Sequence, residues 1–185
     1  MRVISGKAKG RKLKAPSRAR PLTDQVKEAL FNILRDKVND SYFLDLFAGS
    51  GAVGIEALSR GAKIAFLVEF DRRAVQIIRE NLASTGLADE AEVYAMDVIR
   101  AIKIFYKKKA KFDIIFMGAP YDSPWLEKAL EKLGEDSLLA EAGVVVAEHR
   151  KQHPLRERYT NIQVFREVRY GETVLSFYEN SHLSG

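Results

Sequence analysis

The chain has 185 residues, of which 46% are hydrophobic and 30% charged, and it contains no cysteine. These are the values of an ordinary globular domain, and they exclude a disordered, collagen-like or coiled-coil chain, disulfide bonds and thiolate metal sites. Because the three histidines have no metal-ligand spacing and no apolar run approaches the length of a membrane span, we expect no metal and a cytoplasmic protein.

The positive charge is concentrated in the first 20 residues. They hold eight basic and no acidic residues, whereas the rest of the chain has 22 basic and 25 acidic residues. Two short strand-like segments, Arg2–Ser5 and Arg11–Lys14, predict a hairpin. A basic arm on a nearly neutral body is typical of binding to a phosphate backbone, although a merely solubilising terminus has the same composition. The candidate RNA-binding residues are Arg2, Lys7, Lys9, Arg11, Lys12 and Lys14.

A helix is expected after Pro16 and Pro21. Thr23 can cap its first turn, and Asp24 is favourably placed there. Apolar residues then recur at helical spacing on one face. These residues are Val26, Ala29, Leu30, Ile33 and Leu34.

From residue 42 onward, short apolar runs alternate with helical patterns, which predicts strands joined by right-handed crossovers in a buried parallel sheet. The expected strands are Tyr42–Phe47, Ile64–Val68, Ala91–Met96, Phe112–Met117 and Val144–Ala147. Two alternating segments, Ile162–Tyr170 and Thr173–Glu179, flank a Gly-Glu turn and predict an antiparallel hairpin. We therefore expect an α/β fold with an arm at residues 1–20 and one domain at residues 21–185, whose ligand crevice lies at the carboxyl ends of the strands.

Three glycines follow the first of these strands with the spacing G-x-G-x-x-G. Gly49, Gly51 and Gly54 permit tight curvature and the close approach of a ligand, but this spacing also describes a dinucleotide site. Asp45 separates the two cases, because a carboxylate beside the turn repels a pyrophosphate and attracts an ammonium group. The pattern therefore favours S-adenosylmethionine, which carries an ammonium group and no phosphate.

Two further acids end the next strands. Glu69 can accept hydrogen bonds from both ribose hydroxyls, and Asp97 is placed to accept one from the adenine amino group. Each acid also has an ordinary interpretation, since Asp45 and Asp97 could cap a turn or a helix and Glu69 could be a solvated strand end. Three acids at successive strand ends favour the cofactor site.

Several longer motifs resemble a known family. They are Arg20-Pro21-x-Thr23-Asp24-x-Val26 to Leu34, then Leu44 to Gly51, Val68-Glu69, Phe112 to Phe116 and Arg169 to Tyr178. Together they resemble the bacterial methyltransferases that modify the exocyclic N2 amino group of a guanine in 16S ribosomal RNA. The helix motif and the tail hairpin are more specific than the glycine loop, which many methyltransferases share.

The resemblance implies a Rossmann-like class I methyltransferase fold with a seven-stranded, mostly parallel sheet that ends in an antiparallel hairpin. It implies S-adenosyl-L-methionine as methyl donor, S-adenosyl-L-homocysteine as product, and 16S ribosomal RNA or the assembling small subunit as partner. Phe70 and Val98 would flank the adenine, and Thr23 would close the pocket. We expect a monomer. The expected cofactor-binding residues are Thr23, Asp45, Phe47, Ala48, Gly49, Ser50, Gly51, Glu69, Phe70, Asp97 and Val98.

The chain departs from this family at the candidate catalytic motif, Gly118-Ala119-Pro120-Tyr121. The family has Asp or Asn followed by Pro-Pro-Tyr or Pro-Pro-Phe, and that first side chain accepts a hydrogen bond from the target amine. The loss of one such hydrogen bond costs on the order of 3 kcal/mol, or about a hundredfold in rate. Gly118 is therefore consistent with a slow enzyme, with a protein that has lost catalysis, or with a residue altered in this sequence.

The remaining groups of the motif retain possible roles. The carbonyls of Gly118 and Ala119 can still accept from the amine, and Tyr121 can stack on a flipped-out base. Three alternatives stay open beside the RNA methyltransferase. They are a noncatalytic assembly factor that binds RNA and the methyl donor, a DNA amino-methyltransferase, and, least favoured, a nicotinamide dehydrogenase.

Overall fold

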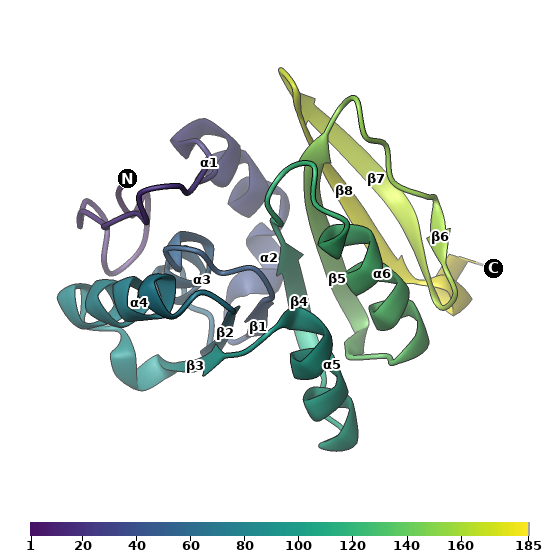
Figure 1. Ribbon diagram of the computed structural model, residues 1–185, viewed down its shortest axis with the longest axis horizontal. Coiled ribbons are helices and arrows are strands. Elements are labelled where there is room, and N and C mark those ends of the chain that lie inside the picture. Colours follow the sequence, from purple (N-terminus) through teal and green to yellow (C-terminus); the bar gives the residue numbers. More distant parts are fainter. Residues whose placement is uncertain (185) are drawn as a thin grey trace.

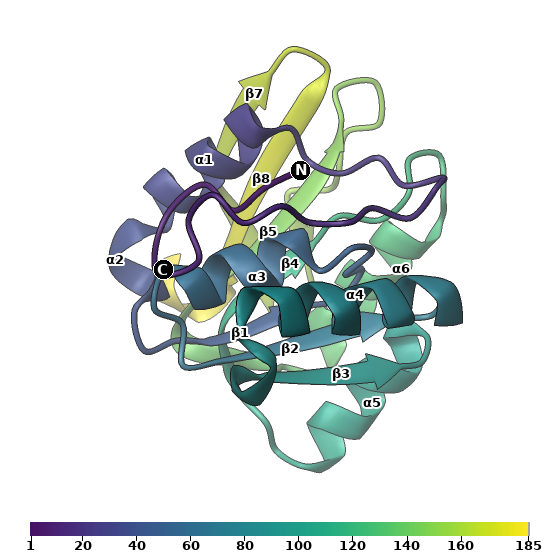
Figure 2. The same cartoon turned by 90° about the vertical axis from the view of Figure 1, so that its left-hand side faces the viewer.

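The computed structural model describes residues 1–184 as one sheet with helices on both faces (Figures 1 and 2). The strands are β1 (Tyr42–Asp45), β2 (Ile64–Glu69), β3 (Ala91–Ala95), β4 (Phe112–Met117), β5 (Leu139–Arg150), β6 (Arg158–Tyr159), β7 (Ile162–Tyr170) and β8 (Thr173–Asn180). The helices are α1 (Asp24–Ile33), α2 (Arg35–Val38), α3 (Ala52–Ser59), α4 (Arg72–Thr85), α5 (Val98–Lys107) and α6 (Trp125–Glu135), with 3-10 turns at Ala88–Glu90 and Ser181–Ser184.

The strands lie in the order β3-β2-β1-β4-β5-β8-β7-β6. Strands β1 to β5 pair in parallel, and the later pairings are antiparallel. This confirms the expected α/β fold and its terminal hairpin. Because the chain leaves β1 for β2 and β3 on one side and returns to β4 on the other, the strand order reverses between β1 and β4 and a crevice opens at their carboxyl ends.

The sheet has one strand more than the seven that the sequence pattern predicted, and β5 is longer than expected. The added strand, β6, has two residues that pair with the start of β7. Strand β5 begins at Leu139 and continues to Arg150, beyond the predicted run Val144–Ala147. Glu141 and Gly143 interrupt the apolar pattern at its start, and its end is polar because it pairs there with β8 alone.

Neighbouring residues of each central strand point into two separate cores. Phe43 packs with residues of α1, α3 and α4, whereas Leu44 packs with residues of α5 and α6. Burial on both faces explains why these strands read as continuous apolar runs. In residues 1–184, no helix is both long and apolar enough to span a membrane.

The basic arm lies on the body of the domain and not apart from it. The predicted hairpin is reduced to one bridge between Arg2 and Lys12, with a few backbone hydrogen bonds beside it. Val3 and Leu13 are buried in the same core as α1 and α3. A Cβ atom on Gly6 would lie 1.8 Å from the carbonyl oxygen of Ser59, so only glycine allows this approach of the arm to α3.

A buried charged cluster holds the arm in place. Glu56 of α3 is fully buried, and its two carboxylate oxygens accept from the backbone N–H groups of Ile4 (2.9 Å) and Ser5 (3.1 Å). The buried Lys27 of α1 lies 3.3 Å from Glu56 Oε1 and donates to the Arg2 carbonyl at 2.7 Å. This cluster joins the arm, α1 and α3, and nothing in the local sequence pattern indicates it.

Candidate active site

A cleft of about 1440 Å³ lies at the carboxyl ends of the parallel strands, and residues 16–22, which join the arm to α1, form part of its lining. Most of the residues expected to bind the methyl donor line it, as does the whole candidate catalytic motif. The residues of these two groups in the cleft are Asp45, Phe47, Ala48, Gly49, Ser50, Glu69, Phe70, Asp97, Val98, Gly118, Ala119, Pro120 and Tyr121. The sheet thus gathers residues that lie far apart in the sequence.

Asp45 is buried at the tip of β1 with an unsatisfied oxygen. Its side chain is 1% exposed, and its Oδ1 atom has no hydrogen-bond partner. Burial raises the pKa of Asp45 to about 7, and the charge of Glu69 adds to this, while hydrogen bonds from the backbone of Phe47 and Gly54 lower it. A buried carboxylate oxygen without a partner is costly, and a cationic ligand group would reduce this cost. The site therefore fits the ammonium group of S-adenosylmethionine.

The three glycines of the loop have different structural roles. Gly49 and Gly51 have φ angles of +57° and +81°, which favour glycine, and Gly51 is the N-cap of α3. A Cβ atom on Gly49 would meet nothing within 4 Å, so the backbone there is open to a ligand. A Cβ atom on Gly54 would lie 2.4 Å from Leu67 Cδ2, so this glycine permits α3 to pack on β2.

Glu69 at the end of β2 fixes the loops around it. Its Oε1 accepts from the Gly49 N–H at 2.9 Å, and its Oε2 accepts from the Asp71 N–H at 2.8 Å. Each carboxylate oxygen has a second acceptor site, so hydrogen bonds to two ribose hydroxyls remain possible. Phe70 beside it is 74% exposed and lines the cleft.

Asp97 after β3 caps a helix, as its ordinary interpretation suggested. Its Oδ1 accepts from the Arg100 N–H at 2.9 Å at the start of α5. The same residue lines the cleft, so the cap holds its carboxylate beside the space where an adenine would lie. Capping and ligand binding are therefore compatible at this residue.

Two expected cofactor residues lie outside the lining of the cleft. Thr23 is exposed and caps α1 through a 3.2 Å hydrogen bond from the Val26 N–H, which confirms the predicted cap. The neighbouring residues 16–22 line the cleft in its place. Gly51 is the second of these residues, although its neighbours Ser50 and Ala52 both line the cleft.

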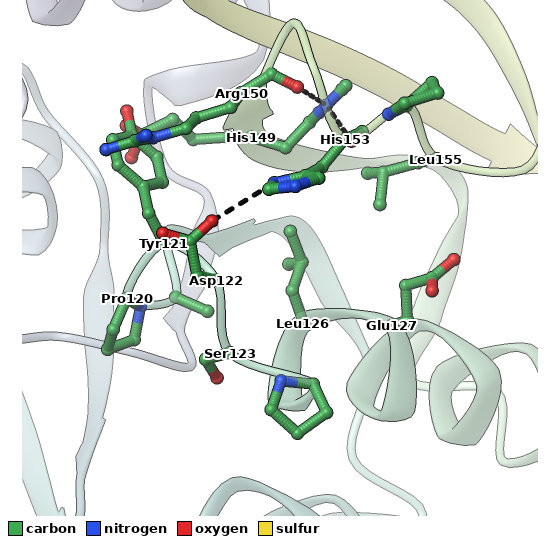
Figure 3. Close-up of a pocket in the computed structure, with 14 residues that line it drawn as sticks. Pro120, Tyr121, Asp122, Ser123, Leu126, Glu127, His149, Arg150, His153 and Leu155 are labelled. Atoms are coloured by element: carbon green, nitrogen blue, oxygen red, sulfur yellow. Dashed lines mark hydrogen bonds and ion pairs between the residues drawn. The ribbon is translucent and has the colours of Figure 1, made fainter.

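The guanidinium groups of two arginines lie near the ring of Tyr121. Its centroid is 4.6 Å from the guanidinium carbon of Arg150 and 5.9 Å from that of Arg20. Figure 3 shows Arg150 extending across this ring from β5. Planar guanidinium groups on an aromatic ring occupy the kind of position that a flipped-out base could take. These two arginines were not among the expected site residues.

A smaller pocket of about 370 Å³ lies beside the catalytic motif (Figure 3). Asp122 and His153 meet across it at 3.3 Å, and Leu126 and Leu155 provide apolar walls. Tyr121 and Glu148 line both this pocket and the large cleft. The two hollows therefore meet at the candidate catalytic motif.

Glu148 is a site residue that was not expected. It lies on β5 beside the end of β4, because Ala147 pairs with Met117. Its side chain is 8% exposed, burial raises its pKa, and it accepts a 2.6 Å hydrogen bond from the Tyr121 hydroxyl. Burial and this hydrogen bond also raise the pKa of Tyr121. The rule that acids at strand ends meet at one edge could have revealed Glu148 after Val144–Ala147.

The arm residues expected to bind RNA fall into two groups. Lys7 and Lys14 pair with Glu90 at 2.6 Å and Glu80 at 2.8 Å, and Arg2 lies 3.8 Å from Asp24. Lys9, Arg11 and Lys12 are exposed on the surface of the arm. None of the six lines the cleft, whereas Arg18 and Arg20 of the following segment do. Within residues 1–184, no group of three or more potential metal ligands is found.

Comparisons with known sequences cover nearly the whole chain. The family model described as Conserved hypothetical protein 95 matches residues 1–179. Ribosomal RNA small subunit methyltransferase D of Escherichia coli (strain K12) is 34% identical over 97% of this chain and 89% of its own length. The Bacillus subtilis (strain 168) protein YlbH, which bears the provisional name of an rRNA methyltransferase, is 40% identical over 97% of this chain and 98% of its own. The family resemblance noted in the motifs is thereby confirmed.

Solved structures share the same architecture. A hypothetical protein of Thermus thermophilus has a TM-score of 0.86 and 36% identity, covering 97% of this chain and 99% of its own. An RNA methyltransferase of Salinibacter ruber, in complex with S-adenosyl-L-homocysteine, has a TM-score of 0.66 at 18% identity and covers 85% of this chain and 92% of its own. At that identity it supports the fold alone, and the expected methyltransferase fold is confirmed.

Proposed function

Because the chain belongs to the family described as Conserved hypothetical protein 95, we propose that it is an S-adenosylmethionine-dependent methyltransferase of small-subunit ribosomal RNA. The observation that carries the proposal is the buried Asp45 oxygen without a partner, beside a glycine turn that has no basic residue for a phosphate. The relatives named for rRNA methylation support the RNA substrate. The finer assignment is the exocyclic N2 amino group of a guanine in 16S ribosomal RNA.

The bound donor would supply an activated methyl group on its sulfonium, and the residues of the cleft would position it. Asp45 binds the ammonium group and Glu69 the ribose, while Phe70 and Val98 flank the adenine and Asp97 accepts from its amino group. The target base stacks on Tyr121 after displacing one of its two arginines. Residues 1–20 act as an RNA-binding arm of the domain at 21–185. One copy of the chain supplies every residue named here, so the proposal requires only a monomer, acting where ribosomes assemble in the cytoplasm.

Binding of the methyl donor can be tested without an RNA substrate. We expect S-adenosylhomocysteine to raise the melting temperature and NAD to leave it unchanged, because a ligand that binds only the native state stabilises it, by about 2.7 kcal/mol at 100 times its Kd. Differential scanning fluorimetry measures both, with adenosine as a control for binding of the nucleoside alone. Stabilisation by NAD and not by S-adenosylhomocysteine would contradict the proposal.

A second candidate is favoured by one observation, the missing side chain at Gly118. It is a noncatalytic assembly factor that binds the methyl donor and RNA. Incubation with labelled S-adenosylmethionine and unmethylated small subunits separates the two, since only the enzyme transfers the label. A protein that binds S-adenosylhomocysteine and small subunits but transfers no label would be the assembly factor.

The arm can be tested through the salt dependence of RNA binding. We expect reversal of charge at Lys9, Arg11 and Lys12 to weaken binding and to flatten the plot of log affinity against log salt, by about 0.7–0.9 in slope for each phosphate that is no longer neutralised. A filter-binding titration at several salt concentrations measures this. Charge reversal at Lys107, Lys108 and Lys109, at the end of α5, is the matched control. Equal slopes for the two triple variants would leave the arm a solubilising terminus.

A further inference from the structure

The missing side chain at Gly118 is compensated in space by a carboxylate of the neighbouring strand. A Cβ atom built on Gly118 would lie 2.9 Å from Oε2 of Glu148. The register of β4 and β5, which pairs Met117 with Ala147, places these two residues side by side. An oxygen of Glu148 therefore lies directly beside the position that a side chain of residue 118 would occupy.

Tyr121 holds this carboxylate in one orientation. Its hydroxyl donates to Oε1 of Glu148 at 2.6 Å, which leaves Oε2 for the neighbourhood of Gly118. Glu148 is nearly buried and still lines both the large cleft and the smaller pocket. The other three acids at the strand ends have separate tasks, because Asp45 faces the glycine turn and Glu69 and Asp97 bind backbone N–H groups. Of the other acids in the lining, Asp71 caps α4 and Asp122 lies 3.3 Å from His153, so Glu148 is the acid left for the methyl acceptor.

We propose that Glu148 is the catalytic carboxylate of the methyl transfer, with Oε2 accepting a hydrogen bond from the exocyclic amine of the target base. This inference rests on the proposed function. The hydrogen bond directs the nitrogen lone pair toward the methyl group and stabilises the positive charge that develops on the nitrogen. Gly118 is then the residue that makes room for Glu148 and not a defect of the site.

The reaction balances with these groups. The lone pair of the amine nitrogen forms the new bond to the methyl carbon, while the bond from that carbon to sulfur breaks and its electron pair stays on sulfur. The nitrogen, which now carries an additional positive charge, releases one proton to the Glu148 carboxylate, and the carboxylate passes it to water. Burial raises the pKa of Glu148, which makes its carboxylate a stronger proton acceptor than an exposed glutamate.

The test is Glu148→Gln. The glutamine keeps the volume and an oxygen for the Tyr121 hydroxyl, but its NH₂ group then faces the target amine, so two donors oppose each other. We expect kcat for methylation of unmethylated small subunits to fall about 100-fold. We expect the Kd for S-adenosylhomocysteine, measured by calorimetry, to stay at its wild-type value, and the melting temperature to be at or above the wild-type value, because burial raises the pKa of Glu148 and the neutral glutamine avoids the cost of a buried charge. Glu141→Gln, the same change at an exposed position of β5, is the control and should have wild-type kcat.

The possible results separate the inference from the function on which it rests. Wild-type kcat in Glu148→Gln would overturn the catalytic role while the methyltransferase stands. A wild-type chain that binds S-adenosylhomocysteine and leaves small subunits unmethylated would overturn the enzyme, and the catalytic role with it. A weaker Kd that accounts for the whole loss of activity would make Glu148 a binding residue and also overturn the role.

A second pair of variants tests whether position is what matters. Glu148→Ala removes the acceptor, and the double variant Gly118→Asn with Glu148→Ala places an amide oxygen in the vacated space. We expect kcat of the double variant to be at least about tenfold higher than kcat of Glu148→Ala, since one well-placed acceptor is restored. An equally slow double variant would overturn the view that Glu148 stands in for a side chain at residue 118.

Discussion

Replacement of Asp45 by asparagine is expected to lower the affinity for S-adenosylhomocysteine about 30-fold or more. The variant keeps the shape of the side chain and removes the charge that would meet the ligand ammonium group. Truncation of one partner of a buried charge pair costs about 2–5 kcal/mol, and each 1.4 kcal/mol is a factor of ten in Kd. Isothermal titration calorimetry at pH 8 measures the change.

The same variant should not lose stability. The folded-state pKa of Asp45 is about 7, above its ordinary value of 3.8, so the native state holds this proton more tightly than the unfolded chain does. This group therefore makes the protein less stable as pH rises from 3.8 to 7, and the full cost is present above pH 7. At pH 8, Asp45→Asn removes that cost, and we expect a melting temperature at or above the wild-type value. A ligand-binding defect with undiminished stability identifies a functional carboxylate.

Ligand binding should also depend on pH through the same group. The ammonium group favours the ionised form of Asp45, so binding below pH 7 has to displace a proton. We expect wild-type affinity to fall from pH 8 to pH 5 and that of Asp45→Asn to change little. Asp113→Asn, at the start of β4 and at the opposite edge of the sheet, is the matched control. Loss of affinity in Asp113→Asn as well would show that the effect is not specific to Asp45.

The parts of the fold that were predicted well are those where the local order of polar and apolar residues indicates which side chains are buried. The bounds of β4 and β7 agree with their predictions, because β4 is apolar except for Asp113, and β7 alternates polar with apolar residues except at the bulge between Val164 and Arg166. The strand β6 has two residues and no such pattern. Tyr159 within it is buried by contacts with residues distant in the sequence, such as Glu127 and Tyr178. Short strands of this kind depend on a partner that the local sequence does not identify.

The same difference holds at the site. The acids at the ends of β1, β2 and β3 were expected there because parallel strands bring their carboxyl ends to one edge. Glu148 follows the predicted run Val144–Ala147 directly, so the same rule could have identified it, but it was not among the expected site residues. Its approach to Gly118 depends on the register of two strands, which pairs Met117 with Ala147. Register of this kind is a tertiary property, and only the structure reveals it.

The charges of the arm show what composition leaves open. A count of lysines and arginines correctly locates a basic segment, but it cannot identify which of them already have partners. Lys7 and Lys14 pair with acids far along the chain, on the 3-10 turn before β3 and on α4. The cations free for RNA are therefore fewer than the composition suggests.

The buried cluster under the arm leads to the largest expected effect on stability, in the variant Glu56→Gln. Glutamine leaves the buried Lys27 ammonium without its counter-charge, and its NH₂ group faces donors of the arm or of Arg60, which lies 2.8 Å from Glu56 Oε2. Breaking a buried pair by removal of one partner costs about 3–5 kcal/mol, a large share of the roughly 5–15 kcal/mol that stabilises a typical domain. Urea unfolding should show this as a lower midpoint at an unchanged m-value.

Two further variants separate the buried charge from other causes of this loss. Glu80→Gln breaks the exposed ion pair with Lys14 and should leave the midpoint at the wild-type value, because exposed pairs contribute little. Lys27→Met combined with Glu56→Gln should recover part of the loss, since it removes the unpaired ammonium from the interior. If Glu56→Gln unfolds at the wild-type midpoint, the cluster does not hold the arm, and the arm must be fixed by its other contacts, which are the buried Val3 and Leu13 and the hydrogen bonds to Ser59 and Asn81.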